Sequence, residues 1–401
     1  MDFAAGVSVI SLGAMFGLNS YAGAGSGKSA NERDSHHSMH RIKTLLLALP
    51  GFATLCARLT RGHVRAFMYH RFTDEPSVHP RRMSVAVFRR QMEYLARTCE
   101  VGNPDDQVRL ESGGNVPAAR PLAVVTADDG YADFMTCAFP VLRELGLPAT
   151  LFVTTGFVDG TIWMWWDRIM WIFEHTDHPR LDYPFHATRL VADLSSPAGR
   201  AAAWQQLVPA LRFVPDVEKE ELVGDLAAVL EVEVPAAAPA RYAPATWEQL
   251  AGMAAAGITM AGHTRTHPIL SQVDAEQARA EIAGSRADLG ARLGTEPDWF
   301  AYPQGGPADY TPATEQAVRD AGYRDSYVAY YDPALEGRPF ARHRYHAVSD
   351  WTEFRWVVCG ANHLVLKLRR LLGMSTGVSI QYWQGSELAA GPADAGTGSA
   401  S

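Results

Sequence analysis

The sequence predicts an α/β fold built on a parallel sheet or barrel. From about residue 64, short apolar segments rich in β-branched residues alternate with segments whose apolar residues recur at helical spacing. The links between these segments are short, and polar residues follow several of the apolar segments directly. This alternation is typical of βα units, whose parallel strands gather ligand-binding groups at their C-terminal ends.

The expected strands are short apolar runs, of which the first ends at His70 and the second at Asp128. They lie at 64–69, 122–127, 149–153, 258–261, 299–302 and 326–330. The expected helices are amphipathic, and one of them has Thr246 as its N-cap and Gly257 as its end. They span 85–98, 139–145, 246–256, 275–293 and 312–321.

Composition divides the chain into three regions. Residues 1–60 are an N-terminal extension with a basic, apolar segment that we expect to be an amphipathic interfacial or docking helix. Residues 61–350 hold the barrel, with a helical insertion at about 160–245 that is first tryptophan-rich and then alanine-rich. Residues 351–401 begin with a basic amphipathic helix and end in a Gly/Ala/Ser-rich tail that we expect to be disordered.

The totals exclude several classes of protein. A hydrophobic content of 47% with 20% charged residues is typical of a globular chain of this length, 401 residues. The net charge of −8 does not suggest a nucleic-acid partner. The cysteines, at 56, 99, 137 and 359, form no CxxC pair, so we expect free thiols.

The ends of the chain bear on its location. The first apolar stretch carries Asp2 and lacks the basic leading segment of a secretory signal. Together with the scattered cysteines and the basic amphipathic helices near both ends, this favours a cytoplasmic location. We expect peripheral association with the inner face of the membrane.

Two adjacent carboxylates, Asp128 and Asp129, end the apolar run LAVVTA and precede Gly130. Adjacent anions repel each other, and each is costly to desolvate unless a positive charge compensates it. An ordinary Asp-Gly turn is the alternative explanation of this pair.

Two histidines, His263 and His267, follow a later strand in the segment AGHTRTHPIL. On one helical turn, this spacing places both imidazoles on one face, although surface histidines often show the same spacing. Two imidazoles and one carboxylate form a three-ligand site for zinc or a similar divalent ion. Such an ion would let Asp128 and Asp129 share a strand end, one as its ligand and the other as a base.

These residues resemble a known family. The segment TADDG resembles the T-F-D-D-G motif of the polysaccharide deacetylases (carbohydrate esterase family 4, the NodB homology domain), and HTRTH resembles their H-[S/T]-x-x-H motif. The segments FMYHRFTDEP, FRRQMEYL and WFAYPQGG resemble a bacterial branch with M-Y-H and F-A-Y-P-x-G motifs. The resemblance covers about residues 64–350 and implies a distorted (β/α) barrel of about seven parallel strands.

The resemblance also implies an activity, the hydrolysis of N-acetyl groups on an amino-sugar polysaccharide or its precursor. It assigns Asp128 as the catalytic base and Asp129, His263 and His267 as ligands of a divalent metal, with zinc as the expected ion. The metal would hold the attacking water while Asp128 takes its proton. A backbone N–H after Asp129 or near Tyr302 would stabilise the oxyanion.

The sequence departs from the family pattern in two places. Ala301 stands where the family usually has an arginine that orients the base, and the motif that supplies the general acid has no clean copy. The segment FARHRYHAV offers His343 and His346 as candidate acids, with surface histidines as the alternative, and Arg342 as a candidate base-orienting charge.

The residues expected to contact the substrate are polar or aromatic side chains near the strand ends or in the insertion. They are His70, Trp165, Trp166, Tyr302, Gln304 and Arg342. The alternative for His70 is a histidine packed in the core, and the alternative for the two tryptophans is packing in a helix core. Two other functions stay open: an amidase on a non-sugar substrate, and a carbohydrate-binding protein with impaired catalysis.

Overall fold

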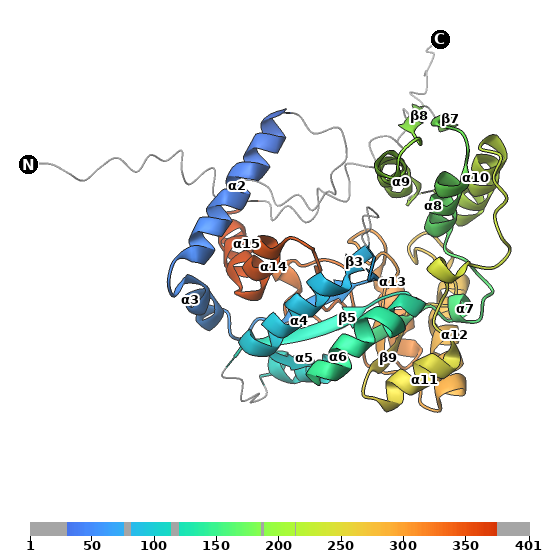
Figure 1. Cartoon of the computed structure of the whole chain (residues 1–401). Helices are drawn as coiled ribbons and strands as arrows, with labels where there is room; N and C mark the ends of the chain where they lie inside the picture. The colour runs from blue at the N-terminus through green and yellow to red at the C-terminus, as the bar shows by residue number, and fades with distance from the viewer. Residues whose placement is uncertain (1–29, 76–81, 114–119, 186–187, 213, 375–401) are drawn as a thin grey trace, which may run out of the picture. The chain divides into compact units, whose positions relative to one another are not determined.

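The computed structural model describes residues 30–75, 82–113, 120–185, 188–212 and 214–374 (Figure 1). Within these ranges the chain divides into two compact units. The larger unit holds the parallel sheet, and the smaller unit consists of Met164–Ala236.

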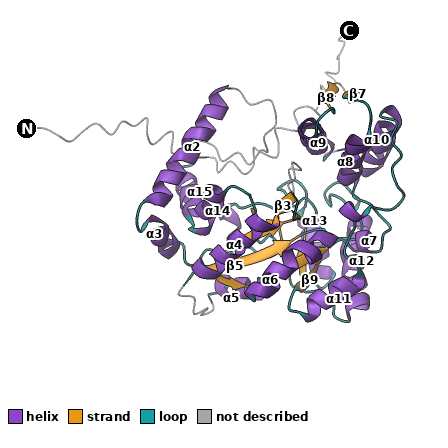
Figure 2. Cartoon of the chain, in the orientation of Figure 1, coloured by secondary structure: helices purple, strands orange, loops and turns teal. Residues whose placement is uncertain are grey.

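The larger unit is built on a curled, parallel sheet (Figure 2). Seven strands follow the order β11-β10-β9-β6-β5-β1-β12, and β4 pairs with β5 beside that path. The bounds are β1 Arg65–Tyr69, β4 Glu100–Gly102, β5 Leu122–Ala127, β6 Thr150–Val153, β9 Thr259–Gly262, β10 Trp299–Ala301, β11 Asp325–Tyr327 and β12 Tyr345–His346. The predicted distorted barrel of about seven parallel strands is confirmed.

The segment that leads into β12 connects the two ends of the curled sheet. Arg342 forms a parallel bridge with Tyr327 of β11. Three residues later, Tyr345 pairs with Phe67 of β1. One extended segment therefore contacts both β11 and β1, and alternate side chains along it face the interior of the barrel.

Most of the predicted helices are present with their predicted ends, because capping side chains define where they begin. Ser84 accepts a hydrogen bond from the Val87 N–H, and Thr246 and Gln249 form a capping box. The bounds are α4 Val85–Thr98, α6 Phe139–Leu145, α11 Trp247–Ala255, α12 Ala275–Leu293 and α13 Pro312–Asp320.

Alternation along β5 separates an outer core from an inner one. Ala123 and Val125 pack in the outer cluster, which also contains residues of α4 and α6. Leu122 and Val124 belong to a separate cluster inside the barrel. Asp128 continues the inner set, so this strand carries a carboxylate into the C-terminal end of the barrel interior.

Several short elements have no counterpart among the predicted segments. A strand of two or three residues is too short to show alternation in the sequence. The additional elements include β2 Arg71–Thr73, β3 Arg82–Ser84, β4, β12, the π-helical turn η1 Phe134–Ala138, and the helical segments α5 Pro104–Glu111, α7 Thr155–Val158, η2 Ala240–Tyr242 and η3 Pro333–Leu335.

The smaller unit contains a hairpin as well as helices. Its elements are α8 Trp165–His175, β7 Arg180–Phe185, β8 Thr188–Asp193, α9 Pro197–Leu211 and α10 Asp216–Val229. The hairpin is antiparallel, and Leu181 and Tyr183 are buried on one face while Asp182 is exposed. The insertion predicted as helical is therefore helical only in part.

The two ends of the described chain pack together in the larger unit (Figure 1). Helix α2 (Ala30–Ala48) contacts α14 (Trp351–Val358), and α3 (Phe52–Leu59) contacts α15 (Ala361–Leu371). The single C-terminal helix that the sequence predicts is broken at Gly360, which has a φ of 83°. A Cβ at Gly360 would lie 2.6 Å from the Arg65 guanidinium, so this close approach requires glycine. The predicted disordered tail lies outside the described residues from 375 onward.

No single helix among the described residues is long and apolar enough to cross a membrane. Ser38–Ala48 and Phe52–Leu59 meet that criterion only as a pair, with a bend of 93° between them.

Candidate active site

The two adjacent carboxylates lie at the C-terminal end of β5. Asp128 and Asp129 are only 2% and 4% exposed. Neighbouring side chains of an extended strand point to opposite faces, but Asp129 adopts a left-handed φ of 78° and Gly130 follows with 91°. The Asp-Gly turn therefore exists, and it is the turn that lets both carboxylates reach polar partners in the barrel interior.

A buried arginine compensates the charge of Asp128. The two terminal nitrogens of Arg344 donate to the two carboxylate oxygens of Asp128 at 2.6 and 2.9 Å, and one of them also donates to Thr126 Oγ1 at 3.2 Å. The guanidinium lies 5.2 Å from the ring centroid of Phe152 and 5.8 Å from that of Tyr327. This paired contact compensates the negative charge of Asp128 and fixes the orientation of its carboxylate.

The prediction that Arg342 orients the base is wrong. Arg342 Nε donates to Asp325 Oδ2 at 2.8 Å, and its Nη1 pairs with Glu111. Asp325 begins β11, so these contacts lie at the N-terminal end of the sheet, opposite Asp128. Arg342 and Arg344 are two residues apart, so their side chains point to the same face of the strand. Only the register of that strand decides which of them meets Asp128.

The surroundings of Asp128 keep it ionised at neutral pH. Burial raises the pKa of Asp128, but Arg344, His263 and His70 together bring it below its ordinary value. An ionised carboxylate held in a defined orientation is the state that a general base needs. His70 also lowers the pKa of His267, which places His70 close to both residues. The contact of His70 with substrate stays a prediction.

The segment from His263 to His267 is a loop, so its predicted helical turn is wrong. Thr264 and His267 have left-handed φ values of 66° and 62°. The His267 N–H donates to Thr264 Oγ1 at 3.0 Å. The two imidazoles nevertheless converge, with ring centroids 4.9 Å apart.

A carboxylate from α12 holds this loop in place. Glu281 Oε2 accepts hydrogen bonds from the Arg265 and Thr266 N–H groups at 2.8 Å each. Glu281 Oε1 accepts one from Thr266 Oγ1 at 2.6 Å. Nothing in the local sequence connects Glu281 with the loop, so sequence reasoning missed this positioning residue.

The residues Asp129, His263 and His267 fit a divalent ion. The Nε2 atoms of the two histidines lie 3.6 and 3.5 Å from Asp129 Oδ1, and all three ligand atoms lie within 4.8 Å of one another. Atoms about 2.0–2.2 Å from a tetrahedral ion are about 3.3–3.6 Å apart, in agreement with these separations.

The protonation of the histidines also suits metal binding. His263 Nδ1 lies 2.8 Å from the Ala301 carbonyl, so the Nδ1–H donates and Nε2 keeps its lone pair toward Asp129. Burial lowers the pKa of His263 and takes that of His267 well below its ordinary value. Both imidazoles are therefore neutral at neutral pH, as metal ligands must be.

The two candidate acids occupy different ends of the sheet. His343 Nε2 donates to the Val64 carbonyl at 3.1 Å, at the start of β1. Arg65, the next residue, pairs with Ala123, which lies five residues before Asp128. At about 3.3 Å per residue, His343 is roughly 15–20 Å from Asp128, at odds with its predicted catalytic role.

His346 has the more suitable position. It pairs with Met68 of β1, and Met68 is level with Thr126, two residues before Asp128. His346 is two residues after Arg344, so both side chains point to the same face of the strand, and His346 is exposed. Its role as the general acid stays a prediction.

Two other predicted substrate residues follow β10. The Tyr302 hydroxyl donates to the Phe340 carbonyl at 3.1 Å and accepts from Ser326 Oγ at 3.0 Å. Its N–H donates to the Tyr327 carbonyl at 3.2 Å, which leaves the backbone after Asp129 as the expected oxyanion donor. Gln304 is half-buried with a φ of 59°. The substrate contacts of both stay predictions.

The two predicted tryptophans belong to the smaller unit. Trp166 is 5% exposed, and its carbonyl accepts a hydrogen bond from Trp204 Nε1 at 2.7 Å. Lys219 Nζ lies 5.4 Å from the Trp165 ring centroid. These contacts are those of a helix core, and the predicted stacking on a sugar stays a prediction.

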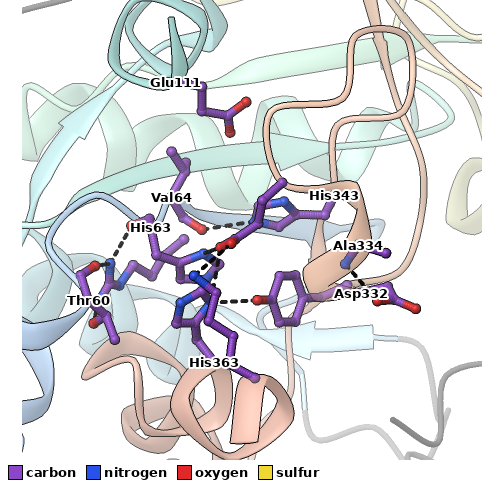
Figure 3. Close-up of polar contacts among 12 residues, drawn as sticks. Thr60, His63, Val64, Glu111, Asp332, Ala334, His343 and His363 are labelled. Atoms are coloured by element: carbon purple, nitrogen blue, oxygen red, sulfur yellow. Dashed lines mark hydrogen bonds and ion pairs between the residues drawn. The ribbon is translucent and has the colours of Figure 1, made fainter. Parts of the chain in front are cut away.

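A second polar cluster surrounds His63 just before β1 (Figure 3). The His63 ring stacks on those of His363 and His343, with centroids 4.0 and 5.1 Å away. Glu336 Oε1 lies 3.0 and 3.1 Å from the Nδ1 atoms of His63 and His363, so these three side chains could also offer ligand atoms to an ion. Lys367 Nζ, however, lies 3.0 Å from the same carboxylate and already compensates its charge.

This cluster predicts acid sensitivity of the fold. Burial lowers the pKa of His343 to about 4, against about 6.5 in an unfolded chain. A histidine with a lowered pKa stabilises the fold fully above pH 6.5, and this contribution falls as the pH drops toward 4. His343 alone should cost about 2 kcal/mol of unfolding free energy between pH 7 and pH 5. Urea unfolding at both pH values would measure this loss.

The control for this prediction is His343→Phe, which keeps a ring at the same position without a titrating group. Its unfolding free energy should depend less steeply on pH over the same interval than that of the wild type. Equal slopes would show that His343 does not titrate differently in the folded and unfolded chains.

The comparison with known families agrees with this geometry. The family model for polysaccharide deacetylases matches residues 229–326, which include the loop of His263 and His267 as well as β10. Residues 229–326 are therefore similar to the polysaccharide deacetylases, which are enzymes that hydrolyse carbon–nitrogen bonds other than peptide bonds. The match does not include Asp128 and Asp129, which only the fold brings beside the histidines.

Several solved structures are similar in fold. Streptococcus pyogenes deacetylase PplD in complex with acetate is 16% identical with a TM-score of 0.49, over 74% of this chain and 97% of that one. IcaB from Ammonifex degensii is 18% identical with a TM-score of 0.47, over 74% and 96%. The BpsB deacetylase domain from Bordetella bronchiseptica is 14% identical with a TM-score of 0.42, over 71% and 95%. No curated protein sequence matches this chain.

Proposed function

We propose that this protein is a polysaccharide deacetylase that removes N-acetyl groups from an amino-sugar exopolysaccharide or its precursor, with Asp128 as the base. The observation that carries the proposal is the Asp128–Arg344 pair directly beside Asp129, His263 and His267. An ionised, oriented carboxylate next to a three-ligand site is the arrangement that amide hydrolysis by an activated water requires.

Each residue of the site has a separate role in the proposed reaction. Arg344 holds both oxygens of Asp128, which accepts a proton from the water that attacks the acetamide carbonyl. Asp129, His263 and His267 would hold a divalent metal, for which zinc suits the two imidazoles and one carboxylate. When bound, such an ion polarises the carbonyl and lowers the pKa of water. His346 is the proposed donor of the proton that the departing amine needs.

The activity is tested by acetate release. We expect release from N-acetylated chito-oligosaccharides to exceed release from small non-sugar amides, because a deacetylase uses contacts with the whole sugar. The opposite preference would favour the amidase alternative. No release from either substrate in the presence of zinc or cobalt would overturn the proposal.

Metal content provides a separate test. We expect about one zinc ion per chain by elemental analysis, lost in Asp129→Ala and in His263→Ala because each removes one of three ligands. Asp128→Asn should keep the metal. His178→Ala, which changes a partly exposed histidine of the smaller unit, is the matched control. Wild-type protein without metal, or ligand variants that keep it, would contradict the assignment.

We also propose a cytoplasmic location. In the structure all four cysteines are free thiols, and Cys56 and Cys359 are close enough to share a hydrogen bond. An oxidising compartment would favour a disulfide between neighbouring thiols, whereas the cytosol keeps them reduced. Mass spectrometry of the native protein under non-reducing conditions tests this location, and a Cys56–Cys359 bridge would count against it.

A further inference from the structure

Exposed large apolar side chains gather at the two ends of the described chain. Of the eleven such side chains among the described residues, eight lie within or directly beside α2, α3 and α15, and the other three lie in the smaller unit. Their exposed fractions reach 69% for Leu45, 66% for Leu59 and 83% for Leu371. The eight are Leu45, Leu49, Leu55, Leu59, Leu368, Leu371, Leu372 and Met374, and we call them the leucine face.

The helices that carry the leucine face pack on a shared core (Figure 1). Leu47 of α2 and Cys56 of α3 are buried in one cluster with Trp356, Cys359 and Ala361. Their inner sides therefore already have partners within the larger unit. The exposed leucines recur three or four residues apart on α3 and at the end of α15, so each of these helices carries apolar side chains on its outer side as well as on its packed side.

Basic residues accompany the leucines along the chain. The acidic side chains that contact these helices from elsewhere, Asp350, Glu353 and Glu336, are paired with His40, Lys43 and Lys367. The stretches 38–62 and 361–374 contain no aspartate or glutamate, although the whole chain has a net charge of −8. Arg41, Arg58, Arg61 and Arg370 are exposed among the leucines. A surface that combines apolar side chains with arginines is complementary to an anionic bilayer, in which negatively charged headgroups cover apolar acyl chains.

We propose that the leucine face docks on an anionic lipid bilayer. The leucines enter the interface between headgroups and acyl chains, and the neighbouring arginines contact lipid phosphates. The bend of 93° between Ser38–Ala48 and Phe52–Leu59 is compatible with helices that lie along the surface. This inference concerns where the protein acts, and it does not depend on the proposed deacetylase activity.

Vesicle flotation of the full-length chain tests the proposal. Vesicles of phosphatidylcholine alone are compared with vesicles that also contain phosphatidylglycerol. We expect the wild type to float with the anionic vesicles, and Leu55→Glu/Leu59→Glu and Leu371→Glu/Leu372→Glu to weaken binding at least about tenfold, because each places two charges in the apolar contact. Arg58→Glu/Arg61→Glu should weaken binding to anionic vesicles by a similar factor.

The matched control is Val217→Glu/Val229→Glu, which changes two exposed apolar side chains on α10 of the smaller unit. It should bind vesicles as the wild type does. Thermal unfolding confirms that each variant is folded, so the test holds whether or not acetate release is found.

Three outcomes would overturn the proposal. The first is a wild type that floats with neither kind of vesicle. The second is binding that the leucine-face variants leave unchanged. The third is a wild-type dimer in sedimentation that these variants convert to a monomer without any vesicle binding, which would make the leucine face a contact between two copies of the chain.

Discussion

Asp128→Asn is expected to reduce the rate of acetate release by about 100- to 10,000-fold, the range that a general base contributes. Asparagine keeps the size of the side chain and a carbonyl oxygen for Arg344. It cannot accept a proton from the attacking water. Steady-state kinetics on N-acetylated chito-oligosaccharides would measure the loss, which should appear in kcat more than in KM.

Metal content and stability separate this effect from structural damage. Asp128→Asn should keep its zinc, because Asp129, His263 and His267 are unchanged, and it should remain folded in thermal unfolding. A variant that keeps both its metal and most of its activity would remove Asp128 from the catalytic role.

Arg344→Met is expected to reduce both stability and activity. The side chains of the Arg344–Asp128 pair are 0% and 3% exposed, so the substitution leaves a buried carboxylate without its partner. Breaking a buried pair in this way costs about 3–5 kcal/mol of unfolding free energy. Urea unfolding at pH 7 would measure the loss.

The pH dependence of kcat/KM distinguishes an effect of Arg344 on the base from a purely structural role, which would leave it unchanged. Arg344 lowers the pKa of Asp128, so its removal raises that pKa. The base is then protonated over a wider range, and the acidic limb of the kcat/KM profile should move to higher pH. Arg344→Lys, which keeps the charge but loses the paired hydrogen bonds, should move this limb less than Arg344→Met.

Arg324→Met is the control for Arg344, because Arg324 makes an exposed ion pair with Asp105 at 2.6 Å. Its loss should change the unfolding free energy by less than about 1 kcal/mol. If Arg344→Met lowered stability with no movement of the acidic limb, Arg344 would support the fold without tuning the base.

The sequence was informative wherever the signal is local. Apolar runs and helical periodicity located the main strands and helices, and the capping box of Thr246 located the start of α11. The polar residues at strand ends pointed to Asp128, Asp129, His263 and His267, since the C-terminal ends of parallel strands meet at one edge of a sheet. Elements of two or three residues, such as β12, were missed because so few positions show no period.

The sequence correctly predicted that His263 and His267 are neighbours, but for an incorrect reason. The sequence predicted that His263 and His267 meet on a helical turn. They meet instead in a loop with two left-handed residues, which Glu281 holds from α12. Spacing along the chain showed that the two side chains could be neighbours, but the backbone conformation between them depends on a carboxylate 14 residues beyond His267.

By itself, the sequence determined which strand ends carry polar groups, because burial and alternation are properties of neighbouring residues. The tertiary structure alone decided which cation meets Asp128. Arg342 and Arg344 look alike in FARHRYHAV, and the register of that segment against β11 and β1 directs Arg342 to Asp325 and Arg344 to Asp128. Register is set by pairing between segments far apart in the chain, so no local pattern contains it.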